Sequence, residues 1–550
     1  MNGHELVAHT LKSLGVSHIY GLSGGTIRQT LPACSQVGIR TIGVRHQQAA
    51  VLMAAAHNYR AGRLLAVAMV SAGPAVTNAA TGILVAWDNR WPLLVIAGTP
   101  PLSESTVHRR GAFQTLDGVS LFQTITKSSI SVQSSSEISQ LLTNGFQIAT
   151  SDQPGPVYLE IPECALKATT AFLPSIAETS SQSASTGPID LEKIERASRV
   201  LLDSGRPAVI LGKGLRWTES IVEIRSLIET YQIPFITSPM GRGYLPDDHP
   251  LCFNAARDAL QIKADTVIVL GARLNWTFRF GKQFSRNAKL IHIDIAPEEL
   301  GRNFPHSIGI RGDIKHVLKE LLDYMQDQGT KSPSVNEGET WLEYLRNIRK
   351  TQKCHLEKKI RISNFPMSPH RLMKEIRDFL PRDAICVLDG RDTMAAAQEV
   401  LLSYEPASRF TAGTNGCMGV GIPFGIGAKL SAPDRMVIVV TGDMAFGIAA
   451  MEMETAVRHQ IPIIVIVVNN DGGCATSVHR DLYPAAHEPV AMFQQRLRYE
   501  KIMEACGGYA ESVDQPEQIQ PALRRAVESG IPACLNVYVD PNAPFQNYLG

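Results

Sequence analysis

Two polar turns, each directly after a buried apolar strand, constrain the fold of this chain more than any other feature. Met436–Thr441 (MVIVVT) ends at Gly442-Asp443, and Ile461–Val468 (IPIIVIVV) ends at Asn469-Asn470. Continuous apolar runs of this length are typical of parallel strands buried on both faces. Ala449–His459, between them, has helical periodicity. The sequence therefore predicts a strand–helix–strand unit that brings an Asp and an Asn to one carboxyl edge of a sheet.

The side chains at this edge are oxygen donors of the kind that a hard divalent cation needs. Mg²⁺ typically takes one or two ligands from protein carboxylates and completes its shell with phosphate and water. The turn Gly442–Phe446 also opens a helix, whose free N–H groups favour phosphate. We therefore expect a magnesium–diphosphate site here, with Asp443 and Asn470 as candidate metal ligands.

Composition and charge argue against several other classes of protein. A net charge of +1 with no basic stripe gives no reason to expect a nucleic acid partner, and no apolar run is long enough to cross a bilayer. The nine cysteines form no CxxC pattern, which suits a reducing compartment better than structural zinc. The first fifteen residues are typical of an amphipathic helix, not of a secretory signal. We expect a cytoplasmic protein without a membrane partner.

Strand-like and helix-like segments alternate along all 550 residues, which predicts an α/β fold of three consecutive parallel-sheet domains. Polar stretches at 178–187 and 326–339 mark the breaks. The predicted domains are 1–175, 188–325 and 360–545. The middle domain has a Rossmann-like layout without GxGxxG after its first strand, so no motif indicates a redox dinucleotide.

At the Gly442-Asp443 and Asn469-Asn470 turns the chain resembles the thiamine diphosphate (ThDP) enzymes, whose signature is a GDG-like turn followed by NN at this spacing. Met444 stands where the signature has its second Gly. Four segments of the first domain also resemble, in order, the pyrimidine-binding domain of the acetolactate synthase-like members. They are Gly21–Gly25, Arg45–Ala50, Ser71–Asn78 and Gly111–Gln114.

The middle and C-terminal segments are most similar to one branch of that family, which contains 2-hydroxyacyl-CoA lyase and oxalyl-CoA decarboxylase. The similar segments are Pro239–Gly243, Gly271–Trp276 and Gly442–Gly447. Two features depart from that branch. Cys474 stands near the place of a Tyr in the lyases, and the chain ends without the basic segment of the oxalyl enzyme.

The resemblance implies a role for each matching residue. Mg²⁺ would be bound by the side chains of Asp443 and Asn470 and the carbonyl of Gly472. The Gly416 carbonyl would accept the 4′-amino hydrogen bond, and Met418 would wedge between the two cofactor rings and hold them bent. Met418 is therefore a candidate catalytic residue with Gln47 and Gln114, and the Gln114 side chain would contact substrate. The remaining expected cofactor contacts are Gly25, Gln47, Pro74, Asn78, Gly390, Thr393, Gly442, Met444 and Ala445.

One departure bears directly on catalysis. The family normally has Glu where this chain has Gln47, and that Glu binds pyrimidine N1′ and promotes loss of the thiazolium C2 proton. A carboxamide cannot share a proton as a carboxylate can, and general acid–base catalysis is worth about 10²–10⁴-fold. Three interpretations stay open: another step limits turnover, the change tunes protonation of intermediates, or catalysis is impaired.

The resemblance implies a ThDP- and Mg²⁺-dependent lyase or carboligase that acts next to a carbonyl, as in 2-oxo acid decarboxylation or carboligation. One alternative is thioester cleavage of the 2-hydroxyacyl-CoA lyase or oxalyl-CoA decarboxylase type. Another is a ThDP-binding protein with little or no turnover.

The resemblance also bears on the middle domain, the assembly and a lid. Related middle domains hold ADP or FAD, for which Arg273 and Asp294 are the candidate contacts, although a purely structural domain is equally consistent. Because the pyrimidine and diphosphate halves of family sites lie on different subunits, we expect a homodimer or homotetramer. Gly472–Met492 is expected to form part of a lid.

Overall fold

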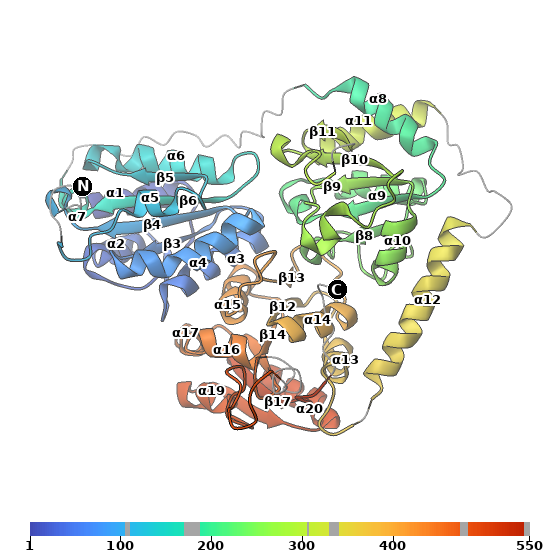
Figure 1. The fold of residues 1–550 in the computed structure, drawn as a ribbon. Coiled ribbons are helices and arrows are strands. Elements are labelled where there is room, and N and C mark those ends of the chain that lie inside the picture. Colours follow the sequence, from blue (N-terminus) through green and yellow to red (C-terminus); the bar gives the residue numbers. More distant parts are fainter. Residues whose placement is uncertain are drawn as a thin grey trace.

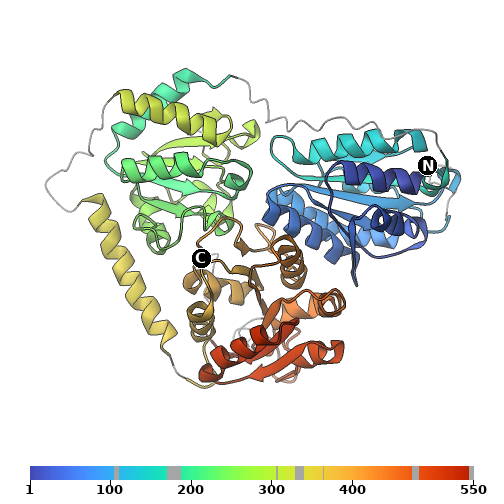
Figure 2. The same ribbon diagram turned by 180° about the vertical axis from the view of Figure 1, so that it is seen from behind.

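The computed structural model describes residues 1–104, 111–169, 188–304, 307–328, 340–362, 364–473 and 482–543, and arranges them as three α/β units (Figures 1 and 2). Each unit is built on one sheet, with six, five and six strands, and the strand pairs within the sheets are parallel. The predicted fold class is therefore confirmed. Among the helices in these ranges, none is long and apolar enough to cross a membrane.

The N-terminal domain carries a sheet with the order β2-β1-β3-β4-β6-β5 and helices on both of its faces (Figure 1). Strands β3 and β4 are almost fully buried, as their apolar runs predict. The strands are β1 (His18–Gly21), β2 (Arg40–Gly43), β3 (Ala66–Val70), β4 (Leu93–Thr99), β5 (Ser128–Ser131) and β6 (Pro156–Pro162). The helices are α1 (Gly3–Ser13), α2 (Thr30–Gln36), α3 (Gln47–Ala61), α4 (Pro74–Asn89), α5 (Gly118–Phe122), α6 (Ile138–Thr150) and α7 (Glu163–Lys167).

The middle domain has the strand order β11-β10-β9-β7-β8. Its strands are β7 (Pro207–Leu211), β8 (Phe235–Thr237), β9 (Thr266–Leu270), β10 (Lys289–Asp294) and β11 (Ser307–Arg311). Its helices are α8 (Leu191–Leu202), α9 (Ile221–Thr230), α10 (Arg257–Lys263) and α11 (Ile314–Asp327). The long helix α12 (Trp341–Ile360) then runs along the edge of the molecule from this domain to the next (Figures 1 and 2).

The C-terminal domain has the order β13-β12-β14-β15-β17-β16, which repeats the order of the first sheet strand for strand. Its strands are β12 (Ile385–Asp389), β13 (Arg409–Phe410), β14 (Val437–Gly442), β15 (Ile464–Asn469), β16 (Tyr509–Val513) and β17 (Ala533–Tyr538). Its helices are α13 (Pro369–Phe379), α14 (Arg391–Val400), α15 (Gly421–Ser431), α16 (Asp443–Ala449), α17 (Glu452–Arg458), α19 (Glu500–Cys506) and α20 (Pro516–Glu528).

Helices α3 and α15 join the N-terminal and C-terminal domains and lie side by side (Figure 1). They approach closely because α15 has Gly427 at the crossing, where a Cβ atom would lie 2.3 Å from the Met53 carbonyl oxygen. Tyr59 and Trp91 of the first domain stack on each other and meet Phe410 of the third at their edges. The two domains therefore share one hydrophobic core.

The predicted strand–helix–strand unit is present. Both strands form, as β14 and β15, and pair with Gly442 opposite Val468. The helical periodicity predicted at 449–459 forms α17, and the helix that opens after Gly442 forms the separate short helix α16, which ends at Ala449. Phe446 of α16 and Glu452 of α17 are both buried. The predicted linker at 178–187 lies outside the described residues.

Candidate active site

A cavity at the carboxyl edge of the third sheet contains most of the C-terminal residues that the sequence singled out. Every residue that lines it belongs to the C-terminal domain. The predicted residues that line it are Gly390, Thr393, Met418, Gly442, Asp443, Met444, Ala445, Asn470 and Gly472. Sequence reasoning missed Pro369, Val468, Gly473 and Val539, which complete the wall. Arg391 and Asp392 also line it, so the wall of the cavity includes one basic and one acidic residue.

Asp443 is the buried carboxylate of this cavity, with 2% of its surface exposed. Its Oδ1 accepts a hydrogen bond from Met444 N at 2.7 Å, and its Oδ2 accepts one from Gly472 N at 2.9 Å. Burial raises the pKa of this carboxyl to about 7, although the backbone N–H groups oppose the shift. A nearby cation would therefore stabilise the ionised form, which fits a metal ligand.

The donors at this edge suit Mg²⁺ better than a softer metal. Within the described ranges, no group of three or more His, Cys, Asp or Glu side chains could hold a metal ion. A metal here would be bound by one carboxylate, the Asn470 amide and backbone carbonyls, with phosphate and water completing the shell. Such hard oxygen ligands are typical of Mg²⁺.

Two helices start at the cavity, which makes it favourable for phosphate. Gly390, with φ of +89°, turns the chain into α14, and Gly442 precedes α16. The two turns pack closely, since a Cβ atom on Gly390 would lie 3.1 Å from Gly442 N. Backbone N–H groups at helix starts bind anions, so this edge can hold a diphosphate.

The loop before α15 brings Met418 to the same cavity. Gly413, Gly416 and Gly419 have φ of +79°, +62° and +81°, a backbone region that is favourable for glycine. Nothing lies within 4 Å of the position that a Cβ atom on Gly416 would take. The loop therefore presents its backbone to open space beside Met418.

The predicted residues of the N-terminal domain gather at its own sheet edge. Gln47 is the first residue of α3, and its Oε1 accepts a hydrogen bond from Asn78 Nδ2 of α4 at 3.0 Å. Pro74 starts α4 directly after Gly73, and a Cβ atom on Gly73 would lie 2.9 Å from the Cβ of Gln114. Gly25 begins the 3₁₀ turn Gly25–Ile27, and nothing lies within 4 Å of the position that a Cβ atom on it would take.

Glu452 of the C-terminal domain fixes the turn that precedes Gln47. Its Oε1 accepts hydrogen bonds from Arg45 N and His46 N, both at 3.0 Å. Burial raises the pKa of this carboxyl, although the hydrogen bonds from Thr455 and from the two backbone N–H groups oppose that shift. The two groups of predicted residues thus lie on neighbouring domains, but the cavity at Asp443 receives no side chain from the first domain.

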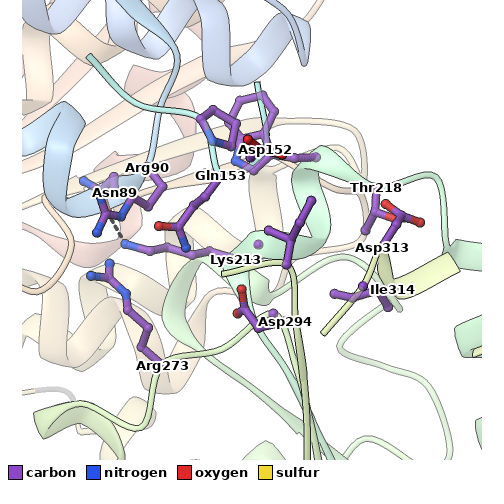
Figure 3. Close-up of a pocket in the computed structure, with 16 residues that line it drawn as sticks. Asn89, Arg90, Asp152, Gln153, Lys213, Thr218, Arg273, Asp294, Asp313 and Ile314 are labelled. Atoms are coloured by element: carbon purple, nitrogen blue, oxygen red, sulfur yellow. Dashed lines mark hydrogen bonds between the residues drawn. The ribbon is translucent and has the colours of Figure 1, made fainter. Parts of the chain in front are cut away.

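A second cavity lies between the middle and N-terminal domains and contains both residues predicted to contact a nucleotide. Arg273 and Asp294 both line it, together with Lys213 (Figure 3). Lys213 Nζ donates to Asn89 Oδ1 at 2.8 Å. Burial lowers the pKa of Lys213 to about 7 and raises that of Asp294 to about 6. Sequence reasoning missed Lys213, although the Gly212-Lys213-Gly214 turn after β7 could have indicated it.

A third cavity, against the C-terminal domain, shares Lys213 and Arg273 with the second. Its other lining residues include Met240, Trp276 and Phe278. The proposed lid at 472–492 is described only in part, because 474–481 lie outside the described residues, and with them Cys474.

Comparison with known proteins defines the class. The chain matches three family models in order along its length. They are the N-terminal TPP binding domain (residues 1–121), central domain (194–321) and C-terminal TPP binding domain (390–537) of thiamine pyrophosphate enzymes. This chain belongs to the thiamine pyrophosphate (ThDP) enzyme family, and it is a ThDP-dependent enzyme.

Its relatives cover nearly the whole chain. It is 32% identical to human 2-hydroxyacyl-CoA lyase 1 over 559 residues, which span 99% of this chain and 95% of the relative. It is 30% identical to oxalyl-CoA decarboxylase of Escherichia coli K12, over 98% of this chain and 95% of the relative. It is 29% identical to the acetolactate synthase large subunit IlvG of Mycobacterium tuberculosis, over 99% of this chain and 97% of the relative.

Proposed function

We propose that this enzyme uses ThDP and Mg²⁺ to break or form a carbon–carbon bond next to a carbonyl, as in decarboxylation or carboligation of 2-oxo acids. The observation that carries the proposal is the meeting of Asp443, Asn470 and Met418 in one cavity with two helix starts. When bound, ThDP supplies a thiazolium carbon that acts as a nucleophile and an electron sink. The protein supplies binding, orientation and exclusion of water.

The C-terminal cavity would hold the diphosphate end. Asp443 and Asn470 would bind Mg²⁺ through their side chains, and Gly472 through its carbonyl. The diphosphate would lie against the Gly390–Thr393 turn and the Gly442–Ala445 turn, both of which line the cavity. Met418 would support the bent cofactor between its rings, and the Gly416 carbonyl would accept from the 4′-amino group.

The N-terminal residues would hold the pyrimidine end, with Gln47 beside N1′. Asn78 orients the Gln47 amide by donating to its oxygen, which leaves the Gln47 NH₂ group as the free end of the side chain. An amide in this place can donate or accept a hydrogen bond but cannot transfer a proton. Gly25, Pro74 and Asn78 would shape the rest of this surface, and Gln114 would contact substrate.

We infer that one cofactor binds between two subunits, in a homodimer or homotetramer. Support comes from the separation of the two half-sites within one chain, since the cavity at Asp443 is lined by the C-terminal domain alone. Chains carrying Gln47→Trp and chains carrying Asp443→Asn should each fail to bind ThDP. After random exchange of equal amounts of the two variants, half of the dimers are mixed and each has one intact site, so about a quarter of all wild-type sites should be recovered. A monomer with bound cofactor by light scattering would contradict this assembly.

A second candidate is cleavage of a CoA thioester of the 2-hydroxyacyl type, and the names of the relatives at 30–32% identity favour it. NMR of reactions with a panel of 2-oxo acids and with a 2-hydroxyacyl-CoA separates the two. CO₂ release or a carboligation product from a 2-oxo acid supports the first proposal. Formyl-CoA formation supports the second. Tight ThDP binding with neither product would support binding without turnover.

We further propose that the cavity between the middle and N-terminal domains holds a nucleotide, ADP or FAD. Lys213 and Arg273 would face its phosphates, and Asp294 at the end of β10 would contact its ribose, as acids at this position of Rossmann-like domains do. Calorimetry with ADP and with FAD tests this, and Arg273→Ala should weaken binding of the nucleotide that fits. A cytoplasmic location remains a prediction from the sequence.

A further inference from the structure

The side chain of Asp88, at the end of α4 in the N-terminal domain, contacts the loop that carries Met418. Its Oδ2 accepts a hydrogen bond from Thr414 N at 2.9 Å and a second one from Thr414 Oγ1. Thr414 and Met418 belong to the same glycine-rich loop before α15. Asp88 of the first domain therefore binds both the backbone N–H and the side-chain hydroxyl of Thr414. Thr414 lies four residues before Met418 in the sequence.

Two further bonds from outside the C-terminal domain fix the same loop. Asn89 Nδ2 donates to the Ala412 carbonyl at 3.2 Å, and a Cβ atom on Gly413 would lie 2.2 Å from Asn89 Oδ1. Trp276 Nε1 of the middle domain donates to the Thr414 carbonyl at 2.9 Å. Each polar group of Thr414 is thus bound by another domain.

Two cations of the middle domain hold Asp88 in turn. Lys213 Nζ donates to the Asp88 carbonyl at 3.0 Å, and Arg273 donates to the same carbonyl and lies 3.7 Å from the carboxylate. Burial raises the pKa of Asp88, but Lys213, the bonds from Thr414 and the Arg273 guanidinium outweigh it, so the net shift is downward. The carboxylate is ionised at neutral pH, and its bonds to Thr414 are charge-assisted.

External anchors matter here because the loop has little stiffness of its own. Three of its seven residues from Gly413 to Gly419 are glycines at positive φ, which restrict the backbone least. Resting on the cofactor placement proposed above, we propose that Asp88 is a positioning residue that sets Gly416 and Met418 against the ring end of the cofactor. It would act through Thr414 and would not touch the cofactor.

The geometry separates this role from the diphosphate end. Gly390, Asp443 and Asn470 directly follow strands β12, β14 and β15, whose pairing does not involve Asp88 or Thr414. Asp88→Asn should therefore weaken binding of whole ThDP and spare binding of inorganic pyrophosphate with Mg²⁺. A general loss of folding would weaken both.

The experiment is calorimetry of the full-length protein with ThDP plus Mg²⁺ and, separately, with pyrophosphate plus Mg²⁺. We expect Asp88→Asn to raise the ThDP dissociation constant about 10-fold, the usual scale for a lost charge-assisted bond, with pyrophosphate binding unchanged within about twofold. Thr414→Val removes one of the two bonds and should have a smaller effect. The variant with both substitutions, Asp88→Asn and Thr414→Val, should bind ThDP no more weakly than Asp88→Asn alone.

Asp248→Asn is the matched control, because Asp248 pairs with Arg382 at 2.7 Å across the middle and C-terminal domains, away from the loop. It should leave both ligands unaffected. Equal loss of ThDP and pyrophosphate binding in Asp88→Asn, or unchanged ThDP binding, would overturn the positioning role. Failure of the wild-type protein to bind ThDP would instead refute the proposed function, and this role with it.

Discussion

Gly472 N donates a hydrogen bond of 2.9 Å to Asp443 Oδ2, and this bond ties the turn after β15 to the turn after β14. The two turns thereby hold one carboxylate and one glycine carbonyl at the same sheet edge before any metal binds. A metal site whose ligands are already in place loses little conformational entropy on binding. This relationship supports the proposal that Mg²⁺ binds there.

Asp443→Asn should weaken Mg²⁺-dependent ThDP binding by more than about 100-fold, because the amide keeps the shape but loses the charge that faces the metal. Calorimetry at fixed Mg²⁺ measures the change. Asp514→Asn, an exposed acid of the same domain that pairs with Arg496, serves as the control. Equal affinities of wild type and Asp443→Asn would show that the metal binds elsewhere.

Gly427→Ala should destabilise the protein by about 1–3 kcal/mol, since the added methyl group would lie 2.3 Å from the Met53 carbonyl oxygen and push α15 away from α3. The midpoint of thermal unfolding reports the loss. Gly447→Ala is the helical control, because nothing lies within 4 Å of its added methyl group. The same midpoint for both variants would mean that the two helices are not packed as described.

Acid should destabilise the N-terminal domain through two adjacent histidines. Burial, with Arg40, lowers the pKa of His18 to about 4, and burial, with His18, lowers that of His57 to about 3. The two rings lie 4.6 Å apart, and His57 Nδ1 bonds to the Tyr20 hydroxyl. Both are neutral in the fold, whereas the unfolded chain protonates them near pH 6.5.

The folded state therefore binds fewer protons between pH 6.5 and 4, so stability is full above pH 6.5 and falls as the pH drops. Between these pH values, the free energy of unfolding should fall by about 1.4 kcal/mol per pH unit for each histidine. Denaturant titrations across this range measure it, and His18→Asn should reduce the slope. His316→Asn, at an exposed position, should not. A slope that His18→Asn leaves intact would assign the acid effect to other groups.

Sequence reasoning could place Asp443 and Asn470 at one sheet edge because they are close along the chain. Asp443 and Asn470 belong to one strand–helix–strand unit, so strand pairing alone brings them together. The placement of Met418 in that cavity came from the resemblance, since a methionine in a loop has no periodicity that indicates its contacts. The roles of these residues remain predictions.

The interdomain contacts could not be predicted in the same way. Asp88, Lys213, Arg273 and Thr414 lie on three domains, and only the packing of α4 against the loops of the other two brings them together. Local sequence at Asp88 is typical of a helix end and gives no indication of its partners. The hydrogen bond that Glu452 accepts from His46 N joins residues more than 400 positions apart, so local sequence could not indicate it either.

We propose that Gln47 stands where other ThDP enzymes have the carboxylate that activates the cofactor. The most direct test of this proposal is hydrogen–deuterium exchange at C2 of bound ThDP, by acid quench and NMR, for the wild type and Gln47→Glu. We predict exchange near the rate of free cofactor in the wild type and about 10²–10⁴-fold faster exchange in the variant. Fast exchange in the wild type that Gln47→Glu leaves unchanged would contradict the account and assign activation to another group.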